Sequence, residues 1–276
     1  MNTKIIKDLM SNPENGEEMP VLFVGHGSPM NAIEENEFSR TWKELGHRIP
    51  EPRAILCISA HWETKGTYVT VSPDPQTIHD FGGFPKELYE VQYPAPGSPE
   101  LAVEVQQLIQ SAEVFPDDRW GLDHGAWSVI RHMYPEAKIP VIEMSMDYTR
   151  DPAFHYSLAK ELVSLRKKGV LIIGSGNIVH NLRLVSWEHA NEPEYGFDWA
   201  LVAREKLNNL ILDNNHQELI NYRKLGREIQ LAVPGPDHFL PLLYTLALKD
   251  NKDNISLFND KTIMGSLSMT GVRIGE

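Results

Sequence analysis

Three apolar stretches of the chain each lead, directly or through a short turn, to a histidine. The stretches are 21–24, 54–60 and 169–174, and the histidines that follow them are His26, His61 and His180. Short apolar runs bounded by Gly, Ser and Pro are typical of strands that are buried on both faces of a sheet. Because open α/β sheets bind ligands at the carboxyl ends of their strands, we expect these three histidines to meet at one edge of one sheet.

The rest of the pattern predicts a mixed α/β protein. Apolar residues at helical spacing predict helices over 31–48, 99–110 and 152–168, more helical structure over 185–226, and a last helix that ends near Leu248. Additional strands are expected over 67–72 beside the run 54–60, over 139–145, and at a sheet edge over 263–274. The pattern contains no convincing domain boundary, and a short polar extension over 1–19 precedes the first strand.

A proline-punctuated loop over 73–99 interrupts this regular pattern. Long irregular segments inside a compact domain are usually functional loops or linkers. The aromatic residues of this loop argue against a flexible linker and favour a lid or a pocket wall, with Phe81, Phe84 and Tyr93 as candidates. Packing in the protein core is the alternative for the same three rings.

The composition limits the classes of partner. With 276 residues the chain is long enough for one large α/β domain with an unaided core, and its formal net charge of −12 argues against a nucleic-acid backbone as partner. No apolar run approaches the length of a membrane span, and the first residues lack the pattern of a signal peptide. The single cysteine, Cys57, cannot form an intrachain disulfide and is expected to be buried. We therefore expect a cytoplasmic protein.

Nine of the eleven histidines fall into two groups by their sequence context. Five lie in polar, helix-like contexts and are expected to be surface or structural residues: His47, His132, His155, His189 and His216. Four follow an apolar run or a Gly/Pro turn: His26, His61, His180 and His238. Neutral imidazole is the commonest metal ligand, and a histidine cluster without a second cysteine indicates a catalytic metal with an open position. Spacing alone supports His26 and His61 more strongly than the other two.

Several longer motifs give the chain a family resemblance. They are Gly25-His-Gly-Ser-Pro-Met30, Ser59-Ala-His-Trp62, His79-Asp-Phe-Gly-Gly-Phe-Pro85, Tyr93-Pro-Ala-Pro-Gly97, Asp123-His-Gly125, Gly174-Ser-Gly-Asn177 with His180-Asn181, and His238-Phe-Leu-Pro-Leu242. In this order, and from about residue 20 to the C-terminus, they resemble the class III extradiol ring-cleaving dioxygenases.

The resemblance implies a fold, a cofactor and a substrate class. It implies a single domain over 20–276, built as a three-layer α/β sandwich around a central, mostly parallel mixed sheet. It also implies a non-haem metal, with Fe(II) in the active form and Zn(II) a plausible occupant. The substrates would be a catechol and O2, without nucleic acid or membrane as partner. The oligomeric state stays open.

The resemblance further implies roles for individual residues. His26 and His61 match the first two metal ligands of the family, and His238 lies where the more distant protocatechuate-type enzymes have a glutamate ligand. Asp237 or a turn carbonyl is expected to orient His238. His180 matches a late histidine that is either the catalytic base or a further metal ligand, and the sequence leaves both roles open. His124 matches a second-sphere histidine that acts on bound oxygen and later as an acid.

The pocket around the substrate is expected to include His79, Phe81, Phe84 and Tyr93. Two other classes of function compete with ring cleavage. A zinc-dependent hydrolase or amidase could use the same histidines to activate water. A non-catalytic metal or ligand-binding protein would need neither His124 nor His180.

Overall fold

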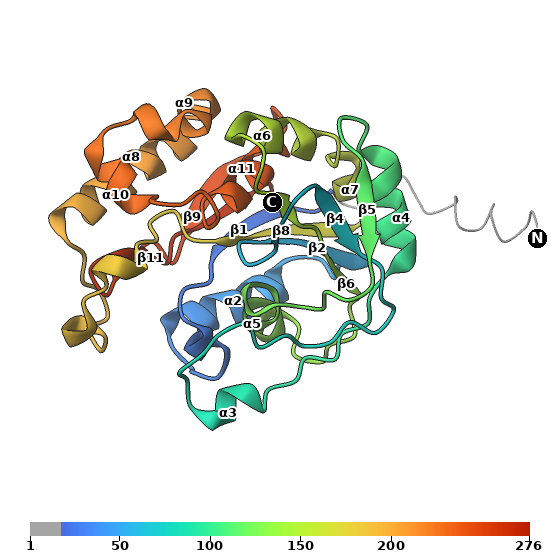
Figure 1. Ribbon diagram of the computed structural model, residues 1–276, viewed down its shortest axis with the longest axis horizontal. Helices are drawn as coiled ribbons and strands as arrows, with labels where there is room; N and C mark the ends of the chain where they lie inside the picture. Colours follow the sequence, from blue (N-terminus) through green and yellow to red (C-terminus); the bar gives the residue numbers. More distant parts are fainter. Residues whose placement is uncertain (1–17) are drawn as a thin grey trace, which may run out of the picture.

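The centre of the protein is a six-stranded sheet with the strand order β6-β2-β8-β1-β12-β9. The computed structural model describes residues 18–276, and Figure 1 shows this sheet between two layers of helices. The parallel strands are β6 (Val141–Glu143), β2 (Ala54–Ser59), β8 (Val170–Gly176) and β1 (Val21–Gly25). The antiparallel strands are β12 (Gly271–Ile274) and β9 (Ile255–Phe258). The predicted α/β class with a mostly parallel mixed sheet is confirmed.

Each face of the sheet has its own apolar core, because successive side chains of a strand point to opposite faces. Phe23 and Ile58 belong to one core, which contains α6 (Pro152–Lys160) and α11 (Leu240–Ala247). Val24 and Cys57 belong to the other core, which contains α2 (Glu37–Arg48) and α5 (His124–Met133). In Figure 1, α2 and α5 lie below the sheet and α6 and α11 above it. Burial on both faces explains why these strands read as continuous apolar runs.

The remaining elements surround this frame. The other helices are α3 (Lys86–Tyr89), α4 (Pro99–Leu108), α7 (Ser164–Lys167), α8 (Asp198–Leu212), α9 (His216–Ile220) and α10 (Arg227–Ala232). Three small two-stranded sheets pair β3 (Glu63–Thr64) with β7 (Met146–Asp147), β4 (Thr67–Thr70) with β5 (Val114–Asp117), and β10 (Thr262–Ile263) with β11 (Leu267–Ser268). Short 3₁₀ helices are η1 (Pro29–Ala32), η2 (Leu182–Leu184), η3 (Trp187–His189) and η4 (Tyr222–Lys224).

Two strand predictions are wrong. The run 67–72 does not pair beside β2, because β2 already has β6 on one side and β8 on the other, and β4 pairs with β5 instead. The tail 263–274 is not one edge strand. It contains parts of three strands, and its last one, β12, is an inner strand that lies between β1 and β9.

Helix boundaries differ from the prediction where local capping decides them. The helix predicted over 31–48 begins, as α2, at Glu37 because Asn36 and Ser39 form a reciprocal capping box. Ser98 caps α4, accepting a hydrogen bond from the backbone N–H of Leu101. The predicted helix 152–168 is divided into α6 and α7, and 185–226 is only partly helical.

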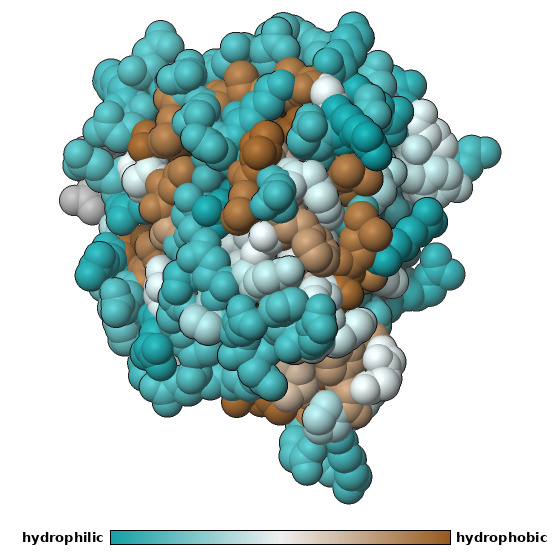
Figure 2. All heavy atoms as spheres, turned by 90° about the vertical axis from the view of Figure 1, so that its left-hand side faces the viewer, coloured by the Kyte–Doolittle hydropathy of each residue, from teal (hydrophilic) through white to brown (hydrophobic). Residues whose placement is uncertain are grey.

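The surface mixes polar and apolar residues. Figure 2 looks onto the side of the molecule that carries α8 and α10, where apolar patches alternate with polar ones. Exposed apolar side chains of the segment after β8 are Leu182, Leu184 and Trp187. No helix within 18–276 combines the length and the apolar character that crossing a membrane requires. The predicted extension 1–19 lies outside the described residues except for Glu18 and Met19.

Close backbone contacts hold the start of α11 against the end of β8. A Cβ atom on Gly176 would lie 2.2 Å from the carbonyl oxygen of His238, and the N–H of Asn177 donates to that same oxygen at 2.9 Å. Only glycine allows the two backbones to approach this closely. This contact places His238 at the carboxyl edge of the sheet.

We expect Gly176→Ala to lower the stability of the protein and to displace His238. Overpacking of this kind costs about 1–3 kcal/mol, which corresponds to a drop of several degrees in Tm for a chain of this size. Thermal unfolding measures the change, and Gly82→Ala is the matched control because a Cβ there meets no atom within 4 Å. Equal Tm values for the two variants would contradict this interpretation.

Candidate metal centre

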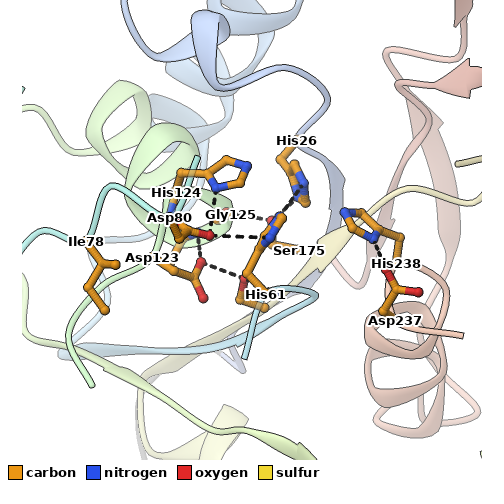
Figure 3. A network of polar contacts seen from close by, with 12 residues as sticks. His26, His61, Ile78, Asp80, Asp123, His124, Gly125, Ser175, Asp237 and His238 are labelled. Carbon is orange, nitrogen blue, oxygen red and sulfur yellow. Dashed lines mark hydrogen bonds and ion pairs between the residues drawn. The ribbon is translucent and has the colours of Figure 1, made fainter. Parts of the chain in front are cut away.

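Five histidines gather at the carboxyl edge of the sheet. His26 directly follows β1, His61 follows β2, and His180 follows β8 after a short turn. His124 is the first residue of α5, and His238 lies just before α11. Figure 3 shows the rings of His26, His61, His124 and His238 turned toward one another. The expectation that three apolar strands bring their histidines to one edge agrees with this arrangement.

The rings of His26, His61 and His238 are almost equally spaced. Their centres lie 5.0 Å apart for His26 and His61, 5.3 Å for His26 and His238, and 5.1 Å for His61 and His238. Three imidazoles that bind one ion tetrahedrally, at metal–nitrogen distances of about 2.0–2.1 Å, have ring centres roughly 5 Å apart. The ring spacing of this trio therefore fits a single metal ion.

Hydrogen bonds fix which nitrogen of two of these rings carries the proton. The Ser175 hydroxyl donates to the carbonyl oxygen of Gly125 at 2.6 Å, so its oxygen accepts from Nδ1–H of His26 at 2.9 Å. Nδ1 of His238 contacts the Asp237 carboxylate, which can only accept when ionised. The Nε2 atoms of His26 and His238 are therefore left with free lone pairs, as metal ligation requires.

The Nε2 atoms of His26 and His61 face each other at 3.2 Å. Two nitrogens that bind one ion tetrahedrally lie about 3.3 Å apart. Without a cation, the Nδ1–H tautomer of His26 makes its Nε2 the acceptor of a hydrogen bond from Nε2–H of His61, and a cation that replaced this proton would bind both nitrogens. The residues present thus fit a metal ion on three observations: ring spacing, tautomer and the distance between donor atoms.

The donor atoms also form two closer groups. The ligand atoms of His26, His61 and His124 lie within 4.8 Å of one another, as do those of His180, Asp237 and His238. The His124 ring centre lies only 4.0 Å from that of His61, which is closer than two rings on one ion would be. In Figure 3 the His238 ring faces His26 and His61, with Asp237 behind it. We therefore favour the evenly spaced trio over the group that contains His124.

Burial favours the neutral form of three histidines of the site. Desolvation, followed by the charges of the neighbouring histidines, holds the pKa of His26 and of His61 well below the usual value. Burial and the nearby His238 lower the pKa of His180 to about 3. Their lone pairs are thus available to a metal or to a substrate proton at neutral pH.

Two carboxylates surround these neutral rings. Burial alone would raise the pKa of Asp80, but the hydrogen bond and the charge of His124 outweigh burial and lower it to about 2. Burial likewise opposes ionisation of Asp237, and the hydrogen bond with His238 reverses that effect and lowers its pKa. Each ionised carboxylate lies behind a histidine and balances part of the charge of a bound cation.

His180 lies against His238 in a different way from the other rings. The two rings are stacked, with their centres 3.5 Å apart and an angle of 9° between their planes. This parallel contact differs from the arrangement of the evenly spaced trio, whose rings meet at angles of 50°, 53° and 89°.

The predicted pocket residues divide into three kinds. Phe81 reaches the site, with its ring centre 5.6 Å from that of His124. His79 and Phe84 lie behind Phe81, at ring-centre distances of 5.7 Å and 5.4 Å. Tyr93 is 2% exposed in the core, and its hydroxyl donates to the carbonyl oxygen of Tyr134. The contacts of Tyr93 are those of core packing.

Sequence reasoning assigned no role to Asp80 and Ser175. Asp80 belongs to the motif His79-Asp80-Phe81 in the loop that was expected to line the pocket, and Ser175 lies between two glycines at the end of β8. The sequence did offer one signal for Asp80, because it lies between His79 and Phe81, which were both predicted to contact the substrate. The hydrogen bonds of either residue become visible only when segments far apart in the chain are brought together.

The fold and the site together define a metal-dependent α/β enzyme. The description "Catalytic LigB subunit of aromatic ring-opening dioxygenase" belongs to the family model that matches residues 20–267. The chain therefore belongs to the LigB family, and it is an extradiol ring-cleaving dioxygenase. The family resemblance read from the motifs is confirmed.

Relatives extend over nearly the whole chain. The 4,5-DOPA dioxygenase extradiol of Escherichia coli K12 is 43% identical over 99% of this chain and 100% of that protein. The protein of the same name from Beta vulgaris is 36% identical over 94% of this chain and 97% of its own length. The crystal structure of an uncharacterized protein from Escherichia coli K12 matches with a TM-score of 0.80 at 38% identity, covering 93% of this chain and 100% of the other.

We expect His26→Ala and His61→Ala each to lose most of the bound metal while the fold is retained, because each removes one of the three ligands that the ring spacing suggests. Elemental analysis of the purified variants gives the metal content, and circular dichroism reports the fold. His47→Ala is the control, since His47 is exposed in α2. Near-stoichiometric metal in either ligand variant would remove that residue from the ligand set.

A second prediction concerns the charge at the third ligand position. His238→Glu should retain metal but bind a catecholate more weakly, because the glutamate makes the centre one unit less positive. His238→Ala should lose metal affinity substantially. Titration of both variants with ferrous iron and then with a catechol tests each step. If His238→Ala binds iron as tightly as the parent, His180 becomes the better candidate for the third ligand.

Proposed function

We propose that this enzyme opens the ring of a catechol with O2 at a ferrous ion held by His26, His61 and His238. The observation that carries this proposal is the even spacing of the three rings, at 5.0–5.3 Å between centres. Ferrous iron supplies Lewis acidity toward the catechol oxygens and electrons toward O2 when it is bound there. Zinc fits the same three nitrogens but cannot change its redox state, so a zinc-loaded protein is expected to be inactive.

The expected substrate is a catechol of the DOPA type, cleaved between positions 4 and 5. Two relatives named 4,5-DOPA dioxygenase extradiol, from Escherichia coli K12 and Beta vulgaris, match almost the entire chain. The Phe81 ring, edge-on to His124, offers an apolar surface to an aromatic ring beside the metal trio. The ionised carboxylates of Asp80 and Asp237 lie behind histidine rings, on the side away from the proposed substrate. The open side of the site is therefore formed by neutral groups.

His124 and His180 are the residues that we propose to move protons. His180 has a depressed pKa of about 3, so it is neutral over the physiological range and can accept a hydrogen bond from a substrate hydroxyl. This value lies below the near-neutral one expected for a free histidine base. His124 has the Asp80 carboxylate behind its ring, and that negative charge stabilises the ring when it holds an extra proton.

Turnover by the reconstituted protein tests the proposal. Metal-free protein is loaded anaerobically with ferrous iron or with zinc, DOPA or an unsubstituted catechol is added, and air is admitted. We expect O2 uptake and a yellow ring-opened product with the iron form alone. Hydrolysis of amide or ester substrates by the zinc form, without O2 uptake by the iron form, would overturn ring cleavage in favour of a hydrolase.

His124→Ala is expected to keep the metal and to lose about 10²–10⁴-fold in kcat, the range that a positioned acid or base supplies. Steady-state O2 uptake gives kcat, and elemental analysis shows that the metal is retained. His189→Ala serves as the control, because its ring is hydrogen-bonded to Ser186 and stacked on Tyr195 in a different segment. Parent-like turnover by His124→Ala would rule out the proton-transfer role.

A further inference from the structure

One carboxylate joins two histidines of the site. Asp80 lies in the loop between β4 and α3, and its Oδ2 atom is 3.0 Å from Nδ1 of His124 and 3.4 Å from Nδ1 of His61. Its Oδ1 atom accepts the backbone N–H of His124 at 2.9 Å. Figure 3 shows Asp80 between the two imidazoles. Its side chain is 16% exposed, so these contacts are shielded from solvent.

Two of these contacts are hydrogen bonds donated by His124, whereas the contact with His61 is an ion-pair distance only. The backbone N–H can only donate, and an ionised carboxylate can only accept. The His124 ring can therefore satisfy Oδ2 only through a protonated Nδ1 atom, which leaves its Nε2 atom without a proton. The lone pair of that Nε2 atom is directed away from Asp80 into the site.

We propose that Asp80 is a positioning residue for ring cleavage, which holds His124 in the Nδ1–H tautomer so that its Nε2 atom faces the site. His124 can then accept a proton at Nε2 and later return it to an oxygen. The Asp80 charge, 3.4 Å from Nδ1 of His61, also favours the tautomer in which His61 can bind a metal. This inference rests on the proposed function for the role of His124, whereas the tautomer itself can be measured without turnover. Asp80 touches neither reacting atoms nor substrate in this arrangement.

The same loop connects this role to the substrate pocket. Phe81, the residue after Asp80, lies edge-on to the His124 ring at 5.6 Å. His79, the residue before it, is anchored through Nε2 to the carbonyl oxygen of Val91 at 3.0 Å. Three consecutive residues therefore hold the loop in place, fix the tautomer of His124 and cover one side of its ring.

An amide cannot replace this carboxylate without changing the proton position on His124. Asparagine offers one accepting oxygen and one donating NH2 group, whereas two oxygens accept here. If the NH2 group faced the backbone N–H of His124, two donors would meet, and that backbone proton cannot move. The NH2 group must therefore face Nδ1, which then gives up its proton, and the ring changes to the Nε2–H tautomer.

The Asp80→Asn variant is therefore the direct test. In ¹⁵N-histidine-labelled protein, both metal-free and zinc-loaded, we expect the parent His124 to show the Nδ1–H tautomer and the variant to show Nε2–H. The wrong tautomer in a Ser-His-Asp triad lowers kcat by about 10⁴, and a loss of about 10²–10⁴ with a smaller change in KM is expected here. Metal affinity should fall about 10–100-fold through His61.

Matched variants separate tautomer control from a structural role. Asp74→Asn removes an exposed carboxylate of the same loop and should change neither the NMR signals of His124 nor kcat. Asp80→Glu keeps two accepting oxygens, so it should retain the Nδ1–H tautomer and more activity than Asp80→Asn. If Asp80→Asn does not fold, Asp80→Glu takes its place in the test. The Nδ1–H signals of the parent and of Asp80→Glu are then compared with those of Asp80→Ala, which has no carboxylate at this position.

The outcomes are distinct. An unchanged Nδ1–H tautomer of His124 in Asp80→Asn, with or without loss of activity, would overturn the proposal. A changed tautomer with parent-like kcat would overturn the positioning role. If the iron-loaded parent does not open catechols at all, the proposed function fails, while the NMR comparison still decides whether Asp80 controls the tautomer.

Discussion

The site depends on bringing neutral imidazole lone pairs together in a buried place. The Nε2 atoms of His26 and His61 face each other at 3.2 Å, close to the separation of two nitrogens that bind one ion. Groups on the opposite side of each ring help to hold them there: Ser175 is hydrogen-bonded to His26, and the Asp80 carboxylate lies 3.4 Å from His61. Rigid strands supply the backbone positions, and burial removes the water that would otherwise solvate these nitrogens. The arrangement is therefore preorganised for a cation.

Charge balance explains how a site of neutral ligands can suit a divalent cation. As expected from the sequence, a third histidine in place of a carboxylate means that the direct ligands would not offset the positive charge of the metal ion. The structure adds Asp237 behind His238 and Asp80 between His61 and His124. Both are ionised, so two negative charges lie one imidazole ring away from the ligand nitrogens. The negative charge thus lies behind the histidine rings and not among the groups that would bind the metal directly. Neutral groups are left to face the substrate.

The sequence predicted those parts of the site that are carried by strands. His26 and His61 were predictable because buried parallel strands are recognisable as apolar runs, and their ends share one edge. Asp80 was not, because its role depends on contacts with helix α5 and with the end of β2 that no local pattern encodes. The inner position of β12 was not predicted for a related reason. This strand has only four residues, and its inner position depends on pairing with β1, which is far away in the sequence. Tyr93 is buried and hydrogen-bonded to Tyr134, which agrees with core packing, the alternative that the sequence left open for an aromatic residue of this loop.

The neighbours of β1 have a consequence for the order of folding. The first strand of the chain pairs with β8, which begins at Val170, and with β12, which begins at Gly271. Strand β1 therefore emerges from the ribosome long before either of its partners exists. Contacts between residues so far apart in the sequence form late. Closing the long loop between them costs conformational entropy before the pairing of the strands offsets that cost. Because His26 follows β1 and His238 precedes α11, a nascent chain cannot bring these two histidines together until residue 238 has been synthesised.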